Sequence, residues 1–267
     1  MAKALEPSGK SGIIEKLVPI LVILSIGLAF MVGVLWQKVS NLEKGGTVAG
    51  TATTQQTAPT TTVSLDTIKS LWSKNLIKFG DANNKNLFVE VVDPSCPYCH
   101  AAGGYDAEVG SSMGSQFTYA SAGGSYQPPV TAMESLVKAG KASMVFVYFP
   151  GHGNGEMGMK ALYCAFDQGK FWEANALLMS NAGYNLMNNT VQNDKTKSGV
   201  IADFLKGVLD ENSLKSCIDS GKYDSRLTDE QNLASTTLGI SGTPGFFINA
   251  TEFAGAYSWS DMQSAVK

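Results

Sequence analysis

The sequence predicts an α/β protein with a block of helices inserted between its strands and a transmembrane helix in front of it. Short apolar runs at 87–92, 143–149 and 245–249 have the length and composition of buried strands. Residues 156–238, between the second and third run, have the pattern of helices separated by turns. The chain also begins with an uncharged apolar run long enough to cross a bilayer.

The N-terminal apolar run at 17–36 is flanked by Lys16 and Lys38. At about 1.5 Å per residue, a helix of this length covers the hydrocarbon core of a bilayer, which is about 30 Å thick. We therefore predict a cytoplasmic N-terminus at 1–16 and an uncleaved transmembrane anchor at 17–37. The run ends in an aromatic residue and a lysine rather than in small residues, which favours an anchor over a cleaved signal peptide. A buried core helix is a weaker alternative, because nearly every face of the run is apolar.

The charge distribution predicts which side of the membrane carries the folded domain. Residues 1–44 contain five Lys and three Glu, whereas the rest of the chain contains 15 Lys and Arg against 20 Asp and Glu. The slight excess of lysine before the apolar run favours a cytoplasmic N-terminus and an exported domain. The net charge of −3 argues against nucleic acid as a partner.

A stretch rich in Gly, Thr and Ala at 45–62 follows the anchor, and its composition predicts a flexible linker. The folded domain is predicted to span 63–267. It opens with a short amphipathic helix at 66–77, in which apolar residues such as Ile68 and Leu71 fall on one face.

The apolar run at 87–92 is predicted to be the central strand of the sheet, because it is apolar on both faces apart from one glutamate. A turn follows, and Cys96-Pro97-Tyr98-Cys99 then begins a helix. At a helix start, the unpaired backbone N–H groups and the positive end of the dipole stabilise a thiolate, and proline suits the first turn. Cys99, one turn further on, can attack a mixed disulfide formed on Cys96. The motif therefore predicts a redox-active pair with Cys96 as nucleophile and Cys99 as resolving thiol.

Two cysteines at this spacing are also half of many zinc sites. A structural zinc site usually needs four ligands, and the remaining candidates are few: His100, His152, Cys164 and Cys217. Neither of these two cysteines belongs to a second C-x-x-C motif, and His152 lies in a Gly-rich segment where a turn residue is expected. A metal site, favoured only because His100 directly follows the motif, and an inert pair remain the alternatives. We expect no metal and no cofactor.

Three segments together resemble the DsbA-like thiol–disulfide oxidoreductases of the thioredoxin superfamily. The first is the strand at 88–91 that leads into the C-x-x-C motif. The second, GKFWE at 169–173, resembles the helical-insertion signature of these proteins, and the third, at 238–249, resembles the loop with their cis-proline and the strand after it. The resemblance covers roughly 87–254. It implies a thioredoxin fold with an α-helical domain inserted at about 156–238.

The resemblance also implies roles for residues outside the cysteine motif. Glu90 matches a buried acid that handles protons for the second cysteine, the alternative being a solvated side chain at a sheet edge. Thr243 and Pro244 would form a cis peptide opposite Cys96, and a plain trans turn is the alternative. Thr243 would then offer its backbone N–H and C=O to an extended substrate segment.

Three residues beside the cysteines are expected to tune the redox potential. The resemblance implies that Pro97 and Tyr98 do so through hydrogen bonding to the Cys96 thiolate. His100 is expected to donate to the thiolate or to repel charge near it and so raise its oxidising power, and an exposed residue without effect is the alternative.

Cys164 and Cys217 lie on two predicted helices, far apart in the sequence. In an oxidising compartment an even number of cysteines suggests pairing, so we predict a structural disulfide between them. Two buried free thiols, which behave as small apolar residues, are the alternative.

The remaining segments are assigned by composition and pattern. Residues 103–129, rich in Gly, Ser and Tyr, are expected to form an irregular excursion or a hairpin. The other predicted elements are a helix at 131–139, a loop at 150–155, a closing strand at 252–254 and a last helix at 258–266.

These observations predict a bacterial thiol–disulfide oxidoreductase, anchored in the cell membrane by a single span, with its catalytic domain outside the cytoplasm. It would oxidise cysteine pairs in exported proteins through Cys96 and Cys99. By analogy, a membrane partner of the DsbB or vitamin K epoxide reductase type would reoxidise the pair. A reductase or isomerase that uses the same site, and a non-enzymatic module that binds a metal or a partner, remain the alternatives.

Overall fold

The computed structural model of the protein describes residues 63–267. The predicted cytoplasmic segment, the transmembrane anchor and the linker, all within 1–62, lie outside the described residues. Among residues 63–267, no helix is both long enough and apolar enough to cross a membrane. The described residues all belong to one structural unit of the chain.

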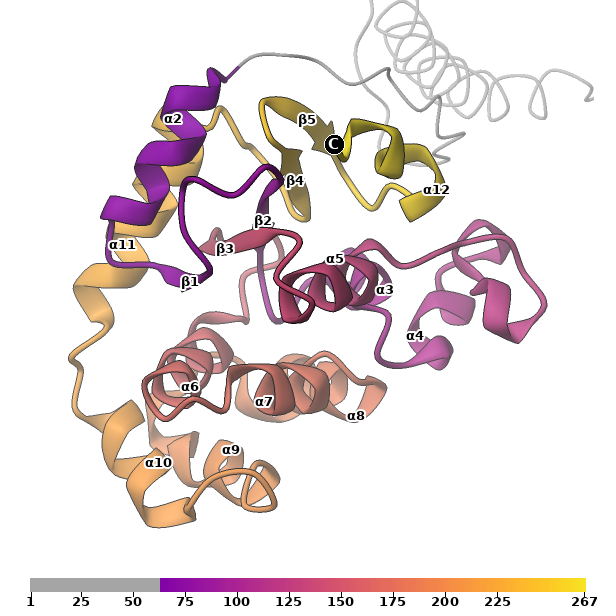
Figure 1. Cartoon of the computed structure of the whole chain (residues 1–267). Helices are drawn as coiled ribbons and strands as arrows, with labels where there is room; N and C mark the ends of the chain where they lie inside the picture. Colours follow the sequence, from indigo (N-terminus) through magenta and orange to yellow (C-terminus); the bar gives the residue numbers. More distant parts are fainter. Residues whose placement is uncertain (1–62) are drawn as a thin grey trace, which may run out of the picture. The chain divides into compact units, whose positions relative to one another are not determined.

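A five-stranded mixed sheet forms the centre of this unit (Figure 1). Its strands are β1 (Ile77–Phe79), β2 (Leu87–Val92), β3 (Ser143–Tyr148), β4 (Gly245–Ile248) and β5 (Thr251–Ala254). Their order in the sheet is β1-β3-β2-β4-β5. β2 is parallel to β3 and antiparallel to β4, and the edge strands β1 and β5 are antiparallel to their neighbours.

Helices cover both faces of this sheet, and some of them form a second layer beside it. The α-helices are α2 (Leu65–Ser70), α3 (Pro97–Gly103), α4 (Ala107–Ser112), α5 (Pro129–Lys138), α6 (Glu156–Asp167), α7 (Phe171–Leu178), α8 (Asn181–Asn185), α9 (Ser198–Phe204), α10 (Glu211–Asp219), α11 (Asp224–Asn232) and α12 (Trp259–Met262). Two π-helical segments, η4 (Leu186–Val191) and η6 (Leu233–Thr237), continue α8 and α11. The 3-10 turns are η1 (Leu71–Ser73), η2 (Ser115–Phe117), η3 (Ala120–Ala122), η5 (Lys195–Lys197) and η7 (Gln263–Ala265).

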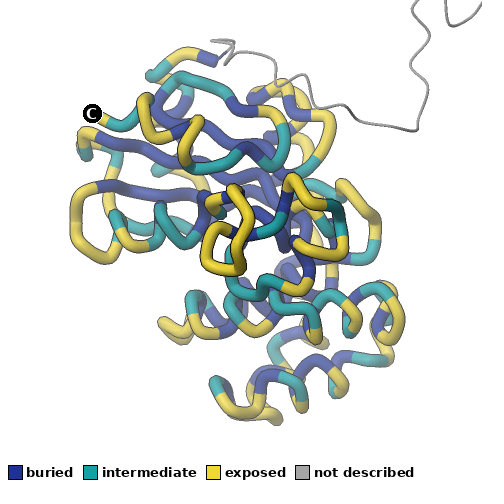
Figure 2. Tube along the Cα trace, turned by 90° about the vertical axis from the view of Figure 1, so that its right-hand side faces the viewer, coloured by how far each residue is buried: buried dark blue, intermediate teal, exposed yellow. Residues whose placement is uncertain are grey.

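The predicted central strand is confirmed, because β2 lies between β3 and β4. Every residue of β2 and of β3 is buried, and Figure 2 shows the strands as a dark blue centre. Strands buried on both faces carry continuous apolar runs, which is why these two segments were readable from the sequence.

The two faces of the sheet are covered by different helices. Because side chains alternate along a strand, Phe88 and Glu90 of β2 share one face while Val89 and Val91 share the other. The Phe88 face packs in the larger core, which includes residues of α3, α5 and the inserted helices. The opposite face packs against α2, η1 and η6 in a second apolar cluster. Glu90 therefore lies on the α3 side of the sheet.

The helical insertion is present between β3 and β4, and α6 to α10 lie together beside the sheet layer (Figure 1). It ends earlier than the predicted boundary at 238, since α11 and η6 return to the sheet. Leu233 and Ala234 pack in the same cluster as Val145 and Val147 of β3. Helical periodicity shows that a segment is a helix, but it does not show which layer the helix packs against.

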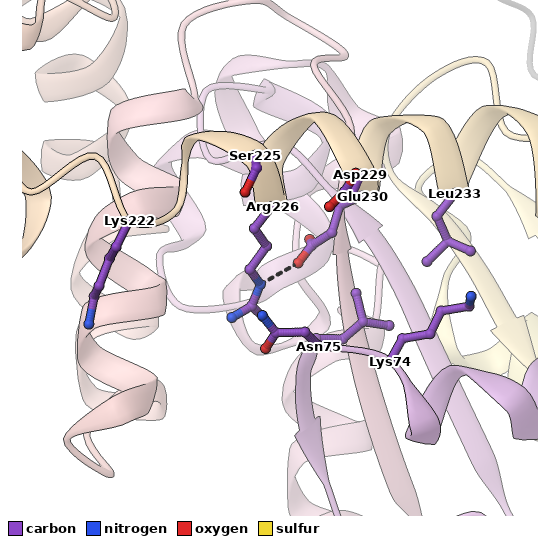
Figure 3. A pocket seen from close by; sticks show the side chains of 9 residues that line it. Lys74, Asn75, Lys222, Ser225, Arg226, Asp229, Glu230 and Leu233 are labelled. Carbon is purple, nitrogen blue, oxygen red and sulfur yellow. Dashed lines mark hydrogen bonds and ion pairs between the residues drawn. The ribbon is translucent and has the colours of Figure 1, made fainter.

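A buried glutamate on α11, paired with an arginine of the same helix, connects α11 to the sheet (Figure 3). Nε of Arg226 lies 2.8 Å from a carboxylate oxygen of Glu230, and both side chains are nearly fully buried. The other carboxylate oxygen of Glu230 accepts a hydrogen bond of 2.7 Å from the backbone N–H of Tyr148 at the end of β3. Glu230 thus pairs with the buried Arg226 guanidinium and accepts a hydrogen bond from the backbone at the end of β3.

The disulfide predicted from the cysteine count is present. Cys164 on α6 and Cys217 on α10 form a bond that joins residues 53 apart in the sequence. The alternative of two free thiols is wrong. The bond ties the first and last helices of the insertion to each other.

We expect the double substitution Cys164→Ser and Cys217→Ser to lower the free energy of unfolding by roughly 3–4 kcal/mol, because the unfolded chain regains the entropy of the closed loop. Both cysteines are replaced so that no unpaired thiol is left to exchange with the C-x-x-C pair. Urea unfolding without reductant measures the change. An unfolding free energy equal to that of the wild type would contradict the expectation.

One predicted segment differs from the structure. The helix expected at 66–77 ends near Ser73, and Ile77 instead begins β1, which pairs in register with Phe146 of β3. An edge strand of three residues has too little sequence pattern to be recognised without its partner. The irregular excursion expected at 103–129 is confirmed, since the segment after α3 contains α4 and two 3-10 turns, and the alternative of a hairpin is wrong.

A small aromatic cluster holds this excursion against α3. Phe117, Tyr119 and Tyr126 pack with Ala101 of α3, and the Tyr119 hydroxyl donates a 2.9 Å hydrogen bond to the Ala101 carbonyl. Gly104, with φ of +80°, ends α3 in the left-handed conformation that glycine adopts most readily. The excursion therefore lies beside the helix that carries the cysteine motif.

Candidate active site

The cysteine motif forms the first turn of α3, directly after β2. Cys96 is the N-cap residue, with extended backbone angles, and Pro97 occupies the start of the helix. The Cys96 carbonyl accepts the first helical hydrogen bonds, from the N–H groups of Cys99 at 3.0 Å and His100 at 3.2 Å. Both cysteines are free thiols in this structure. The predicted position of the pair at a helix start is confirmed.

Thr243 and Pro244 lie opposite the first cysteine. The peptide between them is cis, so the alternative of a trans turn is wrong. The Cys96 thiol donates to the Thr243 carbonyl, with 3.3 Å between sulfur and oxygen. Pairing of β4 with β2, in which Gly245 is opposite Val91, brings this loop to the end of β2.

The two thiols differ in how readily they ionise. A hydrogen bond from the Cys99 side chain is the largest cause that lowers the pKa of Cys96 to about 7, and burial opposes it. Hydrogen bonds from the backbone N–H groups of Cys99 and Tyr98 lower that pKa further. Burial is the largest cause that raises the pKa of Cys99 well above its usual value. A thiolate therefore forms on Cys96 rather than on Cys99.

The nucleophile is more covered than the sequence suggested. Cys96 is 4% exposed and Cys99 is 0% exposed, so the predicted order is right although both residues are buried. The Thr243 carbonyl lies against the Cys96 sulfur. Tyr98, in contrast, is 46% exposed, and its ring meets the edge of Phe117 from the excursion at 5.6 Å between centroids. Tyr98 is thus the most exposed part of the motif.

Glu90 is a buried acid on the central strand. It is 2% exposed, so the alternative of a solvated side chain is wrong. Burial raises the pKa of its carboxyl group from 4.5 to about 8. The charge of Glu90 is also one of the causes that raise the pKa of Cys99, so the two groups are close enough to interact. At neutral pH the carboxyl group therefore holds a proton near the second cysteine.

His100 does not act on Cys96 in the way that the sequence suggested. Its side chain is fully buried, which excludes the exposed alternative. Burial is the main cause that lowers its pKa, so the ring is neutral at pH 7 and places no charge beside the thiolate. Its Nε2 donates a 2.8 Å hydrogen bond to the Pro94 carbonyl, and its ring packs edge-on against Tyr184. His100 holds the turn before Cys96 instead of tuning the sulfur by charge.

A buried polar network below the motif was missed by the sequence analysis. Asp93 and Ser95 are both 0% exposed. The Asp93 carboxylate accepts hydrogen bonds from Ser95 and from the backbone N–H groups of His152 and Gly153. The D-x-S sequence is a known signal for a local side-chain turn and indicates the first contact. The contacts to the loop after β3 depend on tertiary structure.

A cavity in the described part of the chain is lined by residues other than the cysteines. It has a volume of about 380 Å³ and lies between α11 and the segment from η1 to β1 (Figure 3). None of the residues that line it is a predicted site residue. Within residues 63–267, no group of three or more His, Cys, Asp or Glu side chains is placed to hold a metal ion.

Solved structures with a similar fold include DsbA proteins from two bacteria. Wolbachia pipientis α-DsbA1 matches with a TM-score of 0.52 and 19% identity, over 72% of this chain and 89% of that chain. Its double cysteine-to-alanine variant gives a TM-score of 0.55 and 18% identity, over 76% and 94%. Chlamydia trachomatis DsbA gives 0.51 and 15%, over 72% and 90%. At these identities the likeness establishes the fold, which is an α/β thioredoxin fold with an inserted helical region.

Sequence comparison gives the family. A search of curated proteins finds no match to the chain. The sequence model of a family described as thioredoxin matches residues 130–267, just over half of the chain. The matched range includes the Thr243–Pro244 peptide but begins after the cysteine pair, which the fold brings to that peptide. The chain therefore belongs to the thioredoxin family.

Proposed function

We propose that this protein is a DsbA-like thiol–disulfide oxidoreductase that oxidises cysteine pairs in exported proteins. The observation that carries the proposal is the opposite displacement of two pKa values in one helical turn, with Cys96 lowered to about 7 and Cys99 raised. A nucleophile that ionises near neutral pH and a partner that stays protonated are what reversible disulfide exchange requires. The Thr243 carbonyl, 3.3 Å from the Cys96 sulfur, supports a peptide-binding edge at the same place.

The reaction starts from a disulfide between Cys96 and Cys99. A substrate thiolate attacks the Cys96 sulfur, so that a substrate–Cys96 disulfide forms, the Cys96–Cys99 bond breaks and Cys99 leaves as a thiolate. Because the pKa of Cys99 is high, this thiolate takes up a proton. A second substrate thiolate then attacks the substrate sulfur of the mixed disulfide and expels Cys96 as a thiolate. Two electrons pass from the two substrate sulfurs to the enzyme, and the substrate leaves with one new disulfide.

The neighbouring residues have distinct parts in this proposal. Glu90, with its pKa raised to about 8, exchanges a proton with Cys99 as the internal disulfide opens and closes. The backbone N–H of Tyr98 donates to the Cys96 thiolate, which is how this position affects the potential. Thr243 offers its backbone to an extended substrate segment. Pro97 starts the helix without requiring an N–H partner.

The proposed setting is the outer side of a bacterial cell membrane. The apolar run at 17–36, flanked by Lys16 and Lys38, supports a single-span anchor. The disulfide between Cys164 and Cys217 supports an oxidising compartment, where structural disulfides persist. The partners in this proposal are cysteine-containing exported proteins and a membrane protein of the DsbB or vitamin K epoxide reductase type that reoxidises the pair.

One observation favours a second candidate, a disulfide reductase. The nucleophilic cysteine has a pKa of about 7 in thioredoxin, a reductant, and about 3.5 in the strong oxidant DsbA. The value of about 7 for Cys96 matches the first. Equilibration of the pair with glutathione separates the two directions, because thioredoxin has a potential near −270 mV and DsbA one near −120 mV. A potential at the lower end would assign the reductase.

The nucleophile is tested by trapping with Cys99→Ala. Cys96 attacks the peptide disulfide and releases one peptide thiolate, and the mixed disulfide with the other peptide sulfur is expected to persist because the enzyme thiol that would resolve it is absent. Mass spectrometry under non-reducing conditions measures the adduct, and peptide mapping identifies the attached cysteine. The double variant Cys96→Ala with Cys99→Ala is the matched control and should form no adduct. Absence of an adduct in Cys99→Ala would remove the basis of the proposed function.

A further inference from the structure

The carboxylate of Asp93 links two separate segments of the site. Its Oδ1 accepts hydrogen bonds from the N–H of Ser95 at 2.8 Å and from the Ser95 hydroxyl at 2.7 Å. Its Oδ2 accepts from the N–H of His152 at 2.7 Å and from the N–H of Gly153 at 3.2 Å. One oxygen therefore holds the turn that leads into Cys96, while the other holds the loop after β3.

The loop after β3 also touches the residue opposite the nucleophile. A β-carbon on Gly151 would lie 1.9 Å from Oγ1 and 2.9 Å from Cβ of Thr243, which are distances that no two such atoms can keep. The backbone at Gly151 is therefore in direct contact with the Thr243 side chain. At the other end of the loop, a β-carbon on Gly155 would lie 1.8 Å from Oδ1 of Asp93. The loop therefore contacts Thr243 through Gly151 and Asp93 through Gly155.

The turn and the loop are also joined by other polar contacts. The Ser95 hydroxyl accepts a 3.0 Å hydrogen bond from the backbone N–H of Asn154. The Ser95 carbonyl accepts a 3.0 Å bond from the side-chain amide of Asn188, which lies on the π-helical segment η4 of the insertion. Asn188 in turn accepts from the Asn154 side chain at 3.2 Å. Asp93 is thus the centre of a network that reaches the sheet, the loop and the inserted helices.

We propose that Asp93 is a positioning residue for peptide substrates: by holding the 151–153 loop against Thr243, it fixes the backbone edge of Thr243 relative to Cys96. This inference rests on the proposed thiol–disulfide exchange at Cys96 and extends it to the selection of peptides. The reaction rate with a peptide that binds along Thr243 depends on where this backbone edge lies. The rate with a small dithiol, which contacts only the sulfur, does not depend on it.

The position of Asp93 requires a carboxylate, and another polar group of the same size does not replace it. Each Asp93 oxygen faces two hydrogen-bond donors, and only a group with two acceptor oxygens satisfies both pairs. An asparagine has the same size but presents an NH₂ group on one side, where it would meet N–H or O–H donors. One of the two connections is then lost while the local volume is kept.

The first test compares two dithiols in their reaction with the oxidised protein. Asp93→Asn is expected to slow reduction by an extended peptide with two cysteines by about tenfold to a hundredfold more than reduction by dithiothreitol, because a small displacement of the binding edge affects only the bound peptide. Stopped-flow fluorescence or quenched samples give both rates. A peptide-to-dithiothreitol rate ratio equal to that of the wild type would overturn the inference.

The chain offers a matched control at Asp194. Its Oδ1 accepts from the N–H of Thr196 at 2.9 Å and from the Thr196 hydroxyl at 2.7 Å, the same local contacts that Asp93 makes with Ser95. Asp194 lies between η4 and η5 in the insertion and is partly exposed. Asp194→Asn removes the same kind of turn contact and is expected to leave the rate ratio within about twofold of the wild type.

A second variant, Gly151→Ala, changes the contact between the loop and Thr243 on the loop side. It tests the positioning role of Asp93 even where Asp93→Asn does not fold. Gly151→Ala leaves Asp93 intact but places a methyl group against Thr243, so that the loop and Thr243 must separate. We expect the same selective loss with the peptide, and no further loss when Asp93→Asn and Gly151→Ala are combined, because both act through one contact. A normal rate ratio in Gly151→Ala would overturn the inference.

The wild-type protein separates this inference from the proposed function. If the oxidised wild type reacts with neither dithiol, thiol–disulfide exchange at Cys96 is wrong. If it reacts with both, and the substitutions slow both reactions equally, the exchange stands and the positioning role of Asp93 is wrong.

Discussion

Replacement of Cys96 by serine is expected to lower the rate of peptide dithiol oxidation by at least about a thousandfold. A hydroxyl group forms no disulfide, and Cys99 cannot take over because burial keeps its thiol protonated and out of reach of substrate. The rate is measured by the appearance of the disulfide in a fluorescent dithiol peptide. A Cys96→Ser protein that retained a tenth of the activity would show that the nucleophile lies elsewhere.

The lowered pKa of Cys96 can be tested separately with two substitutions of Cys99. The hydrogen bond from Cys99 is the largest cause that holds the pKa of Cys96 near 7. Cys99→Ala removes that donor, so the midpoint of Cys96 alkylation by iodoacetamide should move upward. Cys99→Ser keeps a hydroxyl donor at the same place and should move the midpoint less. Midpoints equal to that of the wild type in both variants would show that the hydrogen bond from Cys99 does not lower the pKa of Cys96.

Substitution of Glu90 by glutamine is expected to remove a pH-dependent loss of stability. Burial raises the pKa of this carboxyl group from 4.5 to about 8, so the folded protein favours the protonated form. Its contribution to stability is fully present below about pH 4.5 and is lost as the pH rises through about 8. Across this window the wild type loses roughly 5 kcal/mol through this group, while glutamine does not titrate.

Urea unfolding of the reduced proteins between pH 4 and 9 measures this effect. The free energy of unfolding of Glu90→Gln minus that of the wild type should rise from about pH 4.5 to about pH 8 and then level off. Glutamine places an uncharged amide in the same buried volume, so a constant offset between the two proteins reports packing rather than titration. Curves that run parallel across the whole window would contradict a carboxyl group with a raised pKa.

Local patterns were sufficient for much of the fold. β2 and β3 were predictable because strands buried on both faces carry continuous apolar runs. The start of α3 was predictable because a proline follows an N-cap residue at the end of a strand. The edge strand β1 was not, because three residues take up strand geometry only when β3 lies beside them.

Some residues of the candidate site were predictable from the sequence and others were not. Cys96 and Cys99 were predictable from their spacing, and Thr243 with Pro244 from the resemblance. His100 was read incorrectly, because its sequence position beside the motif does not show that the insertion and the excursion bury it. Asp93 was missed, because two of its four donors come from a loop about sixty residues further along the chain.

The chemistry could be predicted from the residues alone: two thiols one turn apart at a helix start, an acid on the strand before them, and an X–Pro peptide further on. The difference between these groups and their free forms depends on how the folded chain packs around them. The pKa of Glu90 is raised because the fold buries it. Cys96 ionises before Cys99 because hydrogen bonds lower the pKa of the first thiol, while burial raises the pKa of the second. Desolvation and directed hydrogen bonds depend on which segments meet in space, and no local pattern encodes that.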